Sequence, residues 1–407
     1  MVVGITQVVA QLIATISGII VIRLLPSNEY AFYTIANTML GAMTIIADGG
    51  IASGVWAEGG RFWKDKYKLG AIISTGMELR KKFATLSFLF LAPAIFFLLQ
   101  KHGASVLTST LLVLSILPSF INSLSIGLLV VAPSLNQDVS PLQRKKIESN
   151  ILRLAFTCLL LFIFPVAFVA ITASGIAQMV YNFRLRPICY KYAQRKMESD
   201  QATRKKIIDV VKRSMPMAVY SIFADQINVW LLSLFSSTEA VAQIGALTRL
   251  AMFLSILKAV FYTLATPRFS RLPNIKRLLI SRFLVTEAAL ILISVAVVTA
   301  VAVLQNQLLW ILGNQYSDLN EELILMATVS CLVFCNSILH SMNSARAYIF
   351  NPWILIPLTT VILVVSYLIF PPYNVRNALL ASLIACCAGP IIQNFNFALH
   401  IRSASKQ

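Results

Sequence analysis

The sequence predicts an all-α integral membrane protein of about 12 transmembrane helices. Of its 407 residues, 58% are hydrophobic and only 12% are charged, and its mean hydropathy is +0.78. A water-soluble protein carries roughly 25% charged residues, because its surface must be hydrated. Apolar runs recur along the chain, each long enough to cross a hydrocarbon core of about 30 Å as a helix. The runs do not alternate with polar residues, which excludes the strands of a membrane barrel.

We expect no cleavable signal peptide, because the N-terminus leads directly into a full-length apolar segment without a cleavage site. Two predicted spans, 28–56 and 238–266, are longer than a crossing requires, so we expect them to tilt or to extend into the cytoplasm. The predicted spans are 2–24, 28–56, 83–100, 105–131, 149–165, 166–183, 215–236, 238–266, 283–305, 320–345, 353–370 and 374–400.

Basic residues set the predicted orientation. Of the 34 lysines and arginines, 28 fall in connections after even-numbered spans or in the C-terminal tail, and Arg153, near the start of span 149–165, is counted with them. Short loops rich in these residues stay on the cytoplasmic side, so both termini are predicted to be cytoplasmic. The net charge of +18 then reflects topology. It predicts contact with anionic membrane lipids and no nucleic-acid partner, because the basic residues are spread over short loops.

Two of the basic connections contain aromatic residues among their lysines and arginines. These segments, 57–82 and 184–214, are predicted to be amphipathic helices that lie in the membrane interface.

A weak internal repeat divides the sequence into halves. At an offset of 210 residues, segment 24–29 aligns with segment 234–239. Two halves of six helices would have parallel topology and enclose a central cavity, an arrangement suited to alternating access. We therefore predict an N-terminal six-helix lobe at 1–190, a basic cytoplasmic connection at 191–214 and a C-terminal six-helix lobe at 215–407.

The segment VIRLLPSNEYAFYTIANTMLGAMTIIADGGI (21–51) has a hydrophobic-Arg-Leu-Leu run, a Ser turn, Glu-Tyr and a later Asp-Gly. It resembles the first connection and second span of polysaccharide and O-antigen flippases, a family of the multidrug, oligosaccharidyl-lipid and polysaccharide exporter superfamily. Residues 225–272, with an intramembrane Asp225, are similar to spans seven and eight of that family, and 308–327 is similar to the element before its span ten. The chain departs from the family pattern at residues 244–246.

The resemblance implies a flippase of the bacterial inner membrane. Its implied substrate is an undecaprenyl-diphosphate-linked oligosaccharide, and its implied partners are polysaccharide assembly proteins. The sequence has no nucleotide-binding loop, so we expect an H⁺ or Na⁺ gradient, or the membrane potential, to supply the energy. We expect no cofactor and no metal site, because the six cysteines lack the spacing of metal ligands.

Two alternative functions remain open. One is a small-molecule, multidrug-type exporter of the same superfamily. The other is a membrane glycosyltransferase or polymerase, which would need catalytic acidic or basic residues on a sizeable outer loop. The largest predicted outer connection, 306–319, is short and has one acidic residue, Asp318. We therefore predict that the chain is not an enzyme.

Asp225 and Arg249 are the strongest candidates for the transport site. Both lie about 11 residues from the predicted outer connection, so antiparallel helices would place them at similar depth, about 16 Å into the membrane. A charge at that depth is costly unless it is paired or faces a wet cavity. Arg249 could attract a lipid diphosphate that Asp225 releases, or the two could form a structural ion pair.

Other candidates are polar residues that share a helix face. Amides on such a face could bind sugar hydroxyls or could join helices, and His340 could carry protons or pack between helices. Asp48 and Lys258 are equivalent in the repeat and are a candidate gate. The polar faces of the first and tenth spans consist of Gln7, Gln11, Thr15, Asn336, His340 and Asn343.

Overall fold

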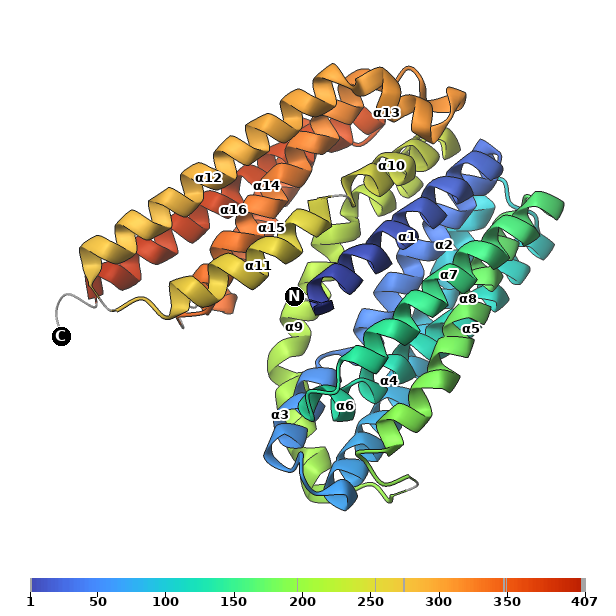
Figure 1. Cartoon of the computed structure of the whole chain (residues 1–407). Coiled ribbons are helices and arrows are strands. Elements are labelled where there is room, and N and C mark those ends of the chain that lie inside the picture. The colour runs from blue at the N-terminus through green and yellow to red at the C-terminus, as the bar shows by residue number, and fades with distance from the viewer. Residues whose placement is uncertain are drawn as a thin grey trace. The chain divides into compact units, whose positions relative to one another are not determined.

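The protein folds as helices joined by short connections, as seen in a computed structural model (Figure 1). The described residues contain no β-strand, and each predicted span coincides with one helix or with two consecutive helices. Eight of the described helical segments are long and apolar enough to cross a membrane. The all-α membrane fold is therefore confirmed. The structure describes residues 2–195, 197–252, 254–273, 275–346, 348 and 350–403.

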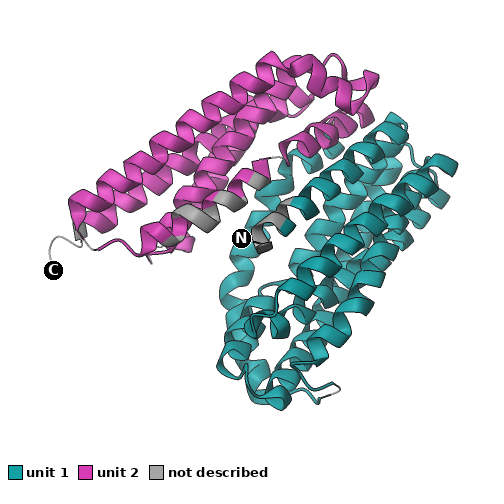
Figure 2. Cartoon of the chain, viewed as in Figure 1, with its two compact units in different colours: residues 1–234 teal, residues 235–407 magenta. Residues whose placement is uncertain are grey.

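The chain divides into two compact units, residues 1–234 and 235–407 (Figure 2). The predicted second lobe begins at residue 215, and one helix contains both positions, so this boundary stays a prediction. The first unit contains α1 (Val2–Leu24), α2 (Ser27–Asp48), α3 (Ile51–Arg61), α4 (Lys66–Lys101), α5 (Val106–Leu129), α6 (Val131–Leu135), α7 (Ser140–Ile163), α8 (Ala167–Tyr190) and nearly all of α9 (Gln201–Phe235). The second unit contains α10 (Thr238–Ala251), α11 (Leu254–Ser270), α12 (Lys276–Val303), α13 (Gln305–Leu312), the short η1 (Asn314–Tyr316), α14 (Asn320–Ser344), α15 (Pro352–Ile369) and α16 (Val375–Ser403).

Helices of the first unit pack through small and polar residues. α5 packs on α8, α8 on α7 and α7 on α1, while α2 and α4 contact each other and α5. An added Cβ at Gly175 of α8 would lie 3.1 Å from Pro118 of α5, so these backbones approach closely. Asn182 also donates a hydrogen bond of 2.6 Å to Asn122 across the same pair of helices. Such contacts are typical of helices that pack within a membrane.

Both overlong predicted spans are broken into two helices. Gly49 and Gly50 have φ angles of 49° and 97°, a left-handed conformation that ends α2 and that glycine adopts without strain. A Cβ on Gly50 would also overlap the side chain of Ser214. In the second case, α11 begins three residues after the last residue of α10. Each overlong span is therefore divided by a break, and its tilt or its extension into the cytoplasm stays a prediction.

The segments predicted as interfacial helices, 57–82 and 184–214, are not separate helices. Their residues belong to the ends of α3, α4, α8 and α9 and to the connections between them. Part of their apolar surface packs on protein, since Leu69 and Ile207 share one buried cluster, whereas Trp63 and Tyr67 are exposed. A helix packed on protein and a helix in a membrane interface have the same amphipathic pattern, so the interfacial position stays a prediction.

The connection between α8 and α9 is fixed to α4 by hydrogen bonds. The backbone N–H of Gln194 donates to the carbonyl of Lys66 at 2.8 Å. The hydroxyl of Ser74 donates to the carbonyl of Met197 at 2.7 Å. These bonds satisfy polar groups of an otherwise irregular segment, so the connection is an ordered part of the first unit.

Asp200 attaches the start of α9 in the same region. Its N–H donates to the hydroxyl of Thr75 at 3.0 Å, and its carboxylate accepts from the hydroxyl of Thr203 at 2.5 Å and from the N–H of Thr203 at 2.9 Å. The bonds from Thr203 lower the pKa of Asp200. One turn later, Lys206 forms an ion pair of 3.1 Å with Glu58 of α3. The first turns of α9 are thus capped and held by both α3 and α4.

In the second unit, α14 packs on α10, α11, α12 and α16, and α15 packs on α16. An aromatic cluster lies among them, with the rings of Phe283 and Phe397 stacked at 3.9 Å between centroids. Arg346 donates to the carbonyls of Phe269 and Leu272 at 3.2 and 3.0 Å. The two carbonyls lie in the last turn of α11 and just beyond it, and that of Phe269 also accepts from the N–H of Leu272. Arg346 therefore adds a donor where a helix end has few of its own.

We expect Gly70→Ala to detach the connection from α4. A Cβ on Gly70 would overlap the backbone of Gln194, so the two segments would separate. Trypsin should then cleave within 191–213 several-fold faster, because protease sites need accessible, mobile backbone. Limited proteolysis of the purified protein measures this rate. Gly60→Ala is the matched control, since its nearest neighbour would be Leu135 at 3.9 Å; equal rates in both variants would contradict a docked connection.

Candidate functional site

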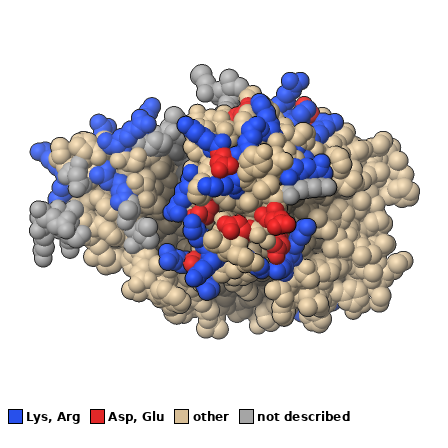
Figure 3. Space-filling view, turned by 90° about the horizontal axis from the view of Figure 1, so that it is seen from below, with Lys and Arg blue, Asp and Glu red and all other residues tan. Residues whose placement is uncertain are grey.

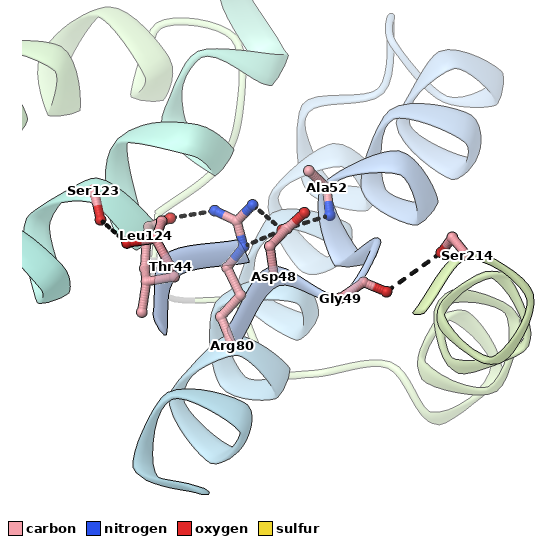
Figure 4. A network of polar contacts seen from close by, with 8 residues as sticks. All are labelled: Thr44, Asp48, Gly49, Ala52, Arg80, Ser123, Leu124 and Ser214. Atoms are coloured by element: carbon pink, nitrogen blue, oxygen red, sulfur yellow. Dashed lines mark hydrogen bonds and ion pairs between the residues drawn. The ribbon is translucent and has the colours of Figure 1, made fainter. Parts of the chain in front are cut away.

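Arg80 lies inside the first unit, where it joins α2, α4 and α5 (Figure 4). Its Nε donates to Asp48 Oδ1 at 2.9 Å, and its terminal nitrogens donate to Asp48 and to the carbonyl of Leu124. The Arg80 side chain is only 6% exposed and that of Asp48 27%. Gly127 leaves room for the guanidinium, since an added Cβ there would lie 2.8 Å from it. One cation therefore connects three helices.

The same carboxylate lies at the break between α2 and α3. Asp48 is the last residue of α2, and its Oδ1 also accepts from the N–H of Ala52 in the first turn of α3 at 3.1 Å. On the other side, the Ser214 hydroxyl lies 3.3 Å from the carbonyl of Gly49 (Figure 4) and 2.8 Å from that of Val210 in its own helix, and its single proton bonds one of the two at a time. A carboxylate at a helix N-terminus is favourable, so the break is stabilised from α4 and from α9.

The predicted gate pairs Asp48 with Lys258. The structure gives Asp48 a different partner, Arg80, within the first unit, and Lys258 lies on α11 of the second unit. The gate stays a prediction. Arg80 was missed as a site residue because it precedes Lys81 and Lys82 and was assigned with them to a cytoplasmic connection.

Polar residues of α7 bond the backbone of α1. Asn150 donates to the carbonyl of Ala10 at 2.8 Å, and Arg153 donates to the carbonyl of Ala14 at 3.2 Å. The two carbonyls are one helical turn apart, so α7 fixes the register of α1. Arg153 lies well inside α7, where its side chain faces α1 and not a cytoplasmic connection.

The polar face predicted on α1 is only partly described. Thr15 is buried, and its hydroxyl donates to the carbonyl of Gln11 at 3.0 Å within the same helix. Gln11 is partly exposed, and the side chain of Gln7 lies outside the described part of the structure. A sugar-binding role for this face stays a prediction.

Asp225 and Arg249 lie on helices that follow each other in the chain. Asp225 is exposed on α9. Arg249 is half-buried in the last turn of α10, where it donates to Met252 Sδ at 3.8 Å. A cation in the last turn of a helix interacts favourably with the helix dipole and with unbonded carbonyls. Because the two residues belong to different units, their pairing stays a prediction.

The polar face predicted on α14 contacts α16. Asn343 is fully buried, and its amide donates to the carbonyl and to the side-chain oxygen of Gln393 at 3.0 Å each. His340 Nδ1 lies 3.5 Å from Gln393 Nε2. Asn336 lies against Gly389, where an added Cβ would be 2.7 Å from the Asn336 side chain. The structure thus brings all three residues to one helix partner.

α16 carries further polar residues that the sequence analysis did not select. Asn394 donates to Glu287 of α12 at 2.6 Å, and Asn396 donates to the carbonyl of Tyr348 at 2.8 Å. The sequence contains a signal that could have identified these residues: Gln393, Asn394 and Asn396 interrupt an apolar span. Polar residues are uncommon inside membrane helices. Together with the amides of α14, they make a polar layer that joins α12, α14 and α16.

The fold has solved relatives, although no protein-family model and no curated protein matches the sequence. A multidrug resistance MATE family transporter of the MOP superfamily, in an inward-facing conformation, has a TM-score of 0.75 at 15% identity, covering 98% of this chain and 96% of that one. The lipid II flippase MurJ, in an inward closed conformation, has a TM-score of 0.75 at 13% identity, covering 98% and 88%. A MOP superfamily transporter from Pyrococcus furiosus has a TM-score of 0.65 at 13% identity, covering 99% and 94%.

The chain therefore has the fold of membrane transporters of the MOP superfamily over nearly its whole length. At identities of 13–15%, the similarity is one of architecture. The three solved structures are of transporters and a flippase. The multi-pass, all-α architecture expected from the sequence is confirmed.

We expect Asp48→Ala to destabilise the first unit by about 3 kcal/mol, because it leaves the buried Arg80 guanidinium without its carboxylate. The midpoint of thermal unfolding in detergent measures the loss. Replacing both residues, as Asp48→Ala with Arg80→Met, should recover much of it, since the uncompensated charge is removed. A double variant no more stable than Asp48→Ala would show that Arg80 is not the cause.

We expect Asn343→Ala to cost about 1–3 kcal/mol, because the buried side chain of Gln393 loses its partner. The unfolding midpoint in detergent again measures the change. Ser330→Ala on the same helix is the control, because the Ser330 hydroxyl bonds only its own helix at the carbonyl of Met326. Equal midpoints for both variants would exclude Asn343 as a link between α14 and α16.

Proposed function

We propose that this chain is a flippase that moves an undecaprenyl-diphosphate-linked oligosaccharide across the bacterial inner membrane by alternating access, with both termini in the cytoplasm. The observation that carries the proposal is the fold shared with the lipid II flippase MurJ over 98% of this chain. The resemblance of segments 21–51 and 225–272 to O-antigen flippases supports the same class of substrate.

The proposed substrate has three chemically different parts: a diphosphate, a polar glycan and an apolar chain. In this proposal Arg249 binds the diphosphate, because a guanidinium forms paired, charge-assisted hydrogen bonds with phosphate oxygens. Asp225 then competes for Arg249 and promotes release. Polar residues of α1 and α14 provide hydrogen bonds to glycan hydroxyls.

The energy source belongs to the same proposal. A carboxylate such as Asp225 can take up H⁺ or contact Na⁺, so either gradient could drive the return of the empty transporter. Proteins of polysaccharide assembly would supply and remove the substrate on the two membrane faces, without a cofactor held by this chain.

A small-molecule exporter is the second candidate. The fold of the multidrug resistance transporter matches this chain with the same TM-score, 0.75. This candidate predicts that loss of the gene lowers drug resistance and leaves surface glycan unchanged. The flippase predicts the reverse, because lipid-linked intermediates would accumulate on the cytoplasmic face.

Deletion of the gene followed by analysis of lipid-linked intermediates and drug resistance separates the two candidates. In the deletion strain, Arg249→Ala and Asp225→Asn should each fail to restore export while reaching wild-type abundance in the membrane. Arg376→Gln is the matched control, since its ion pair with Glu321 is exposed on both sides, at 58% and 68%. Full export by both site variants would remove Asp225 and Arg249 from the transport site.

A further inference from the structure

The two units differ in how their basic residues are neutralised. In the first unit, the carboxylates of Glu58, Glu78, Asp138 and Glu148 form ion pairs with lysines and arginines at 2.7–3.8 Å. Figure 3 shows acidic side chains surrounded by basic ones on the charged face of the molecule. The positive charge of the first unit is therefore partly compensated by its own residues.

The turn between α11 and α12 has no such compensation. Five basic residues lie in or beside it, and all are exposed. None forms an ion pair with another described residue, and the nearest acidic residue along α12, Glu287, instead accepts a hydrogen bond from Asn394. The five are Arg268, Arg271, Lys276, Arg277 and Arg282.

The start of α12 has the electrostatics of an anion site. Its N-cap residue, Ile275, offers no side-chain hydrogen bond to the first turn, and no other described side chain caps the backbone N–H groups there. Lys276 and Arg277 occupy this first turn, where cations oppose the helix dipole. An anion between these groups would accept from the N–H donors and neutralise both side chains.

A groove of about 670 Å³ extends from this positive end along α12. Residues at spacings of three, four, seven and eight share one helix face, and the groove residues follow that pattern. Beyond the groove, the exposed side chains of Ile291, Leu292 and Val295 continue the apolar face. The groove is lined by Lys276, Arg277, Ile280, Ser281, Leu284 and Val285.

We propose that this groove binds an anionic phospholipid of the surrounding leaflet. The phosphate lies at Lys276, Arg277 and the Ser281 hydroxyl, and an acyl chain runs along Ile280 and Leu284 and onward over the apolar face of α12. The order of side chains along the helix matches the order of groups in the lipid, with the headgroup at the helix end and the chain toward the hydrocarbon.

The shape of the groove favours a membrane lipid over the transported substrate. All six lining residues come from one helix, so a molecule in the groove keeps most of its surface against neighbouring lipids. A transported glycan must instead be enclosed by protein on several sides while it crosses hydrocarbon. The site does not depend on the proposed function, because either kind of exporter could hold such a lipid.

The test compares lipid retention by wild type and by Lys276→Gln/Arg277→Gln, both in nanodiscs of phosphatidylcholine with added phosphatidylglycerol. Each basic side chain near an anionic surface contributes roughly fivefold in binding. The double variant should therefore bind phosphatidylglycerol roughly 25-fold more weakly, as measured by native mass spectrometry. It should keep the wild-type unfolding midpoint in pure phosphatidylcholine, since both side chains are exposed.

Arg268→Gln/Arg271→Gln is the matched control, because it removes the same charge from the same unit outside the groove lining. Retention close to wild type in this control supports a defined site. Equal losses in the two double variants, or no loss in the groove variant, would overturn it. Displacement of phosphatidylglycerol by an equal amount of undecaprenyl diphosphate would also overturn it, because the groove would then select the isoprenoid carrier.

Discussion

Within each of the two units, arginine side chains join helices by donating to main-chain carbonyls. A guanidinium buried among helices has no water to bond, so the protein must provide the acceptors, and main-chain carbonyls have a second lone pair for this. Arg80 bonds the carbonyl of Leu124, Arg153 bonds that of Ala14, and Arg346 bonds two carbonyls at the end of α11. A guanidinium suits this role because it carries several donors and remains charged. The breaks and crossings of helices depend on these contacts.

Much of the fold could be predicted from the sequence, because membrane spans are recorded locally in apolar runs and basic connections. Contacts between distant segments could not. Asn343 was recognised as polar, but its partner Gln393 lies 50 residues away. Arg80 and Arg153 resembled loop residues, since a basic residue near a span end has the same sequence context whether it faces water or protein. The Gly49–Gly50 break was visible as a glycine pair, whereas no glycine or proline marks the end of α10.

The candidate site residues fall into two groups: those that contact a neighbouring helix, and Arg249, which lies at a helix end. Asn336, His340 and Asn343 all contact α16, and their contacts explain the polar character of α14 by helix packing. Arg249 lies in the last turn of α10, at the interruption of a predicted span. Interrupted helices with charged or polar ends are common where transporters bind their substrates. Arg249 therefore has the strongest structural claim to a transport role, whereas the α14 amides also have contacts with α16.

The attachment of residues 194–200 to α4 also affects how the protein folds while it is being synthesised. α4 leaves the ribosome about a hundred residues before this connection, so an apolar surface that includes Leu69 and Ile72 waits uncovered during translation. Only when the start of α9 emerges can Ile207 and Val211 complete that buried cluster. Nascent chains with exposed apolar surface are the ones that chaperones bind. The first unit is therefore completed by the last of its segments to be synthesised.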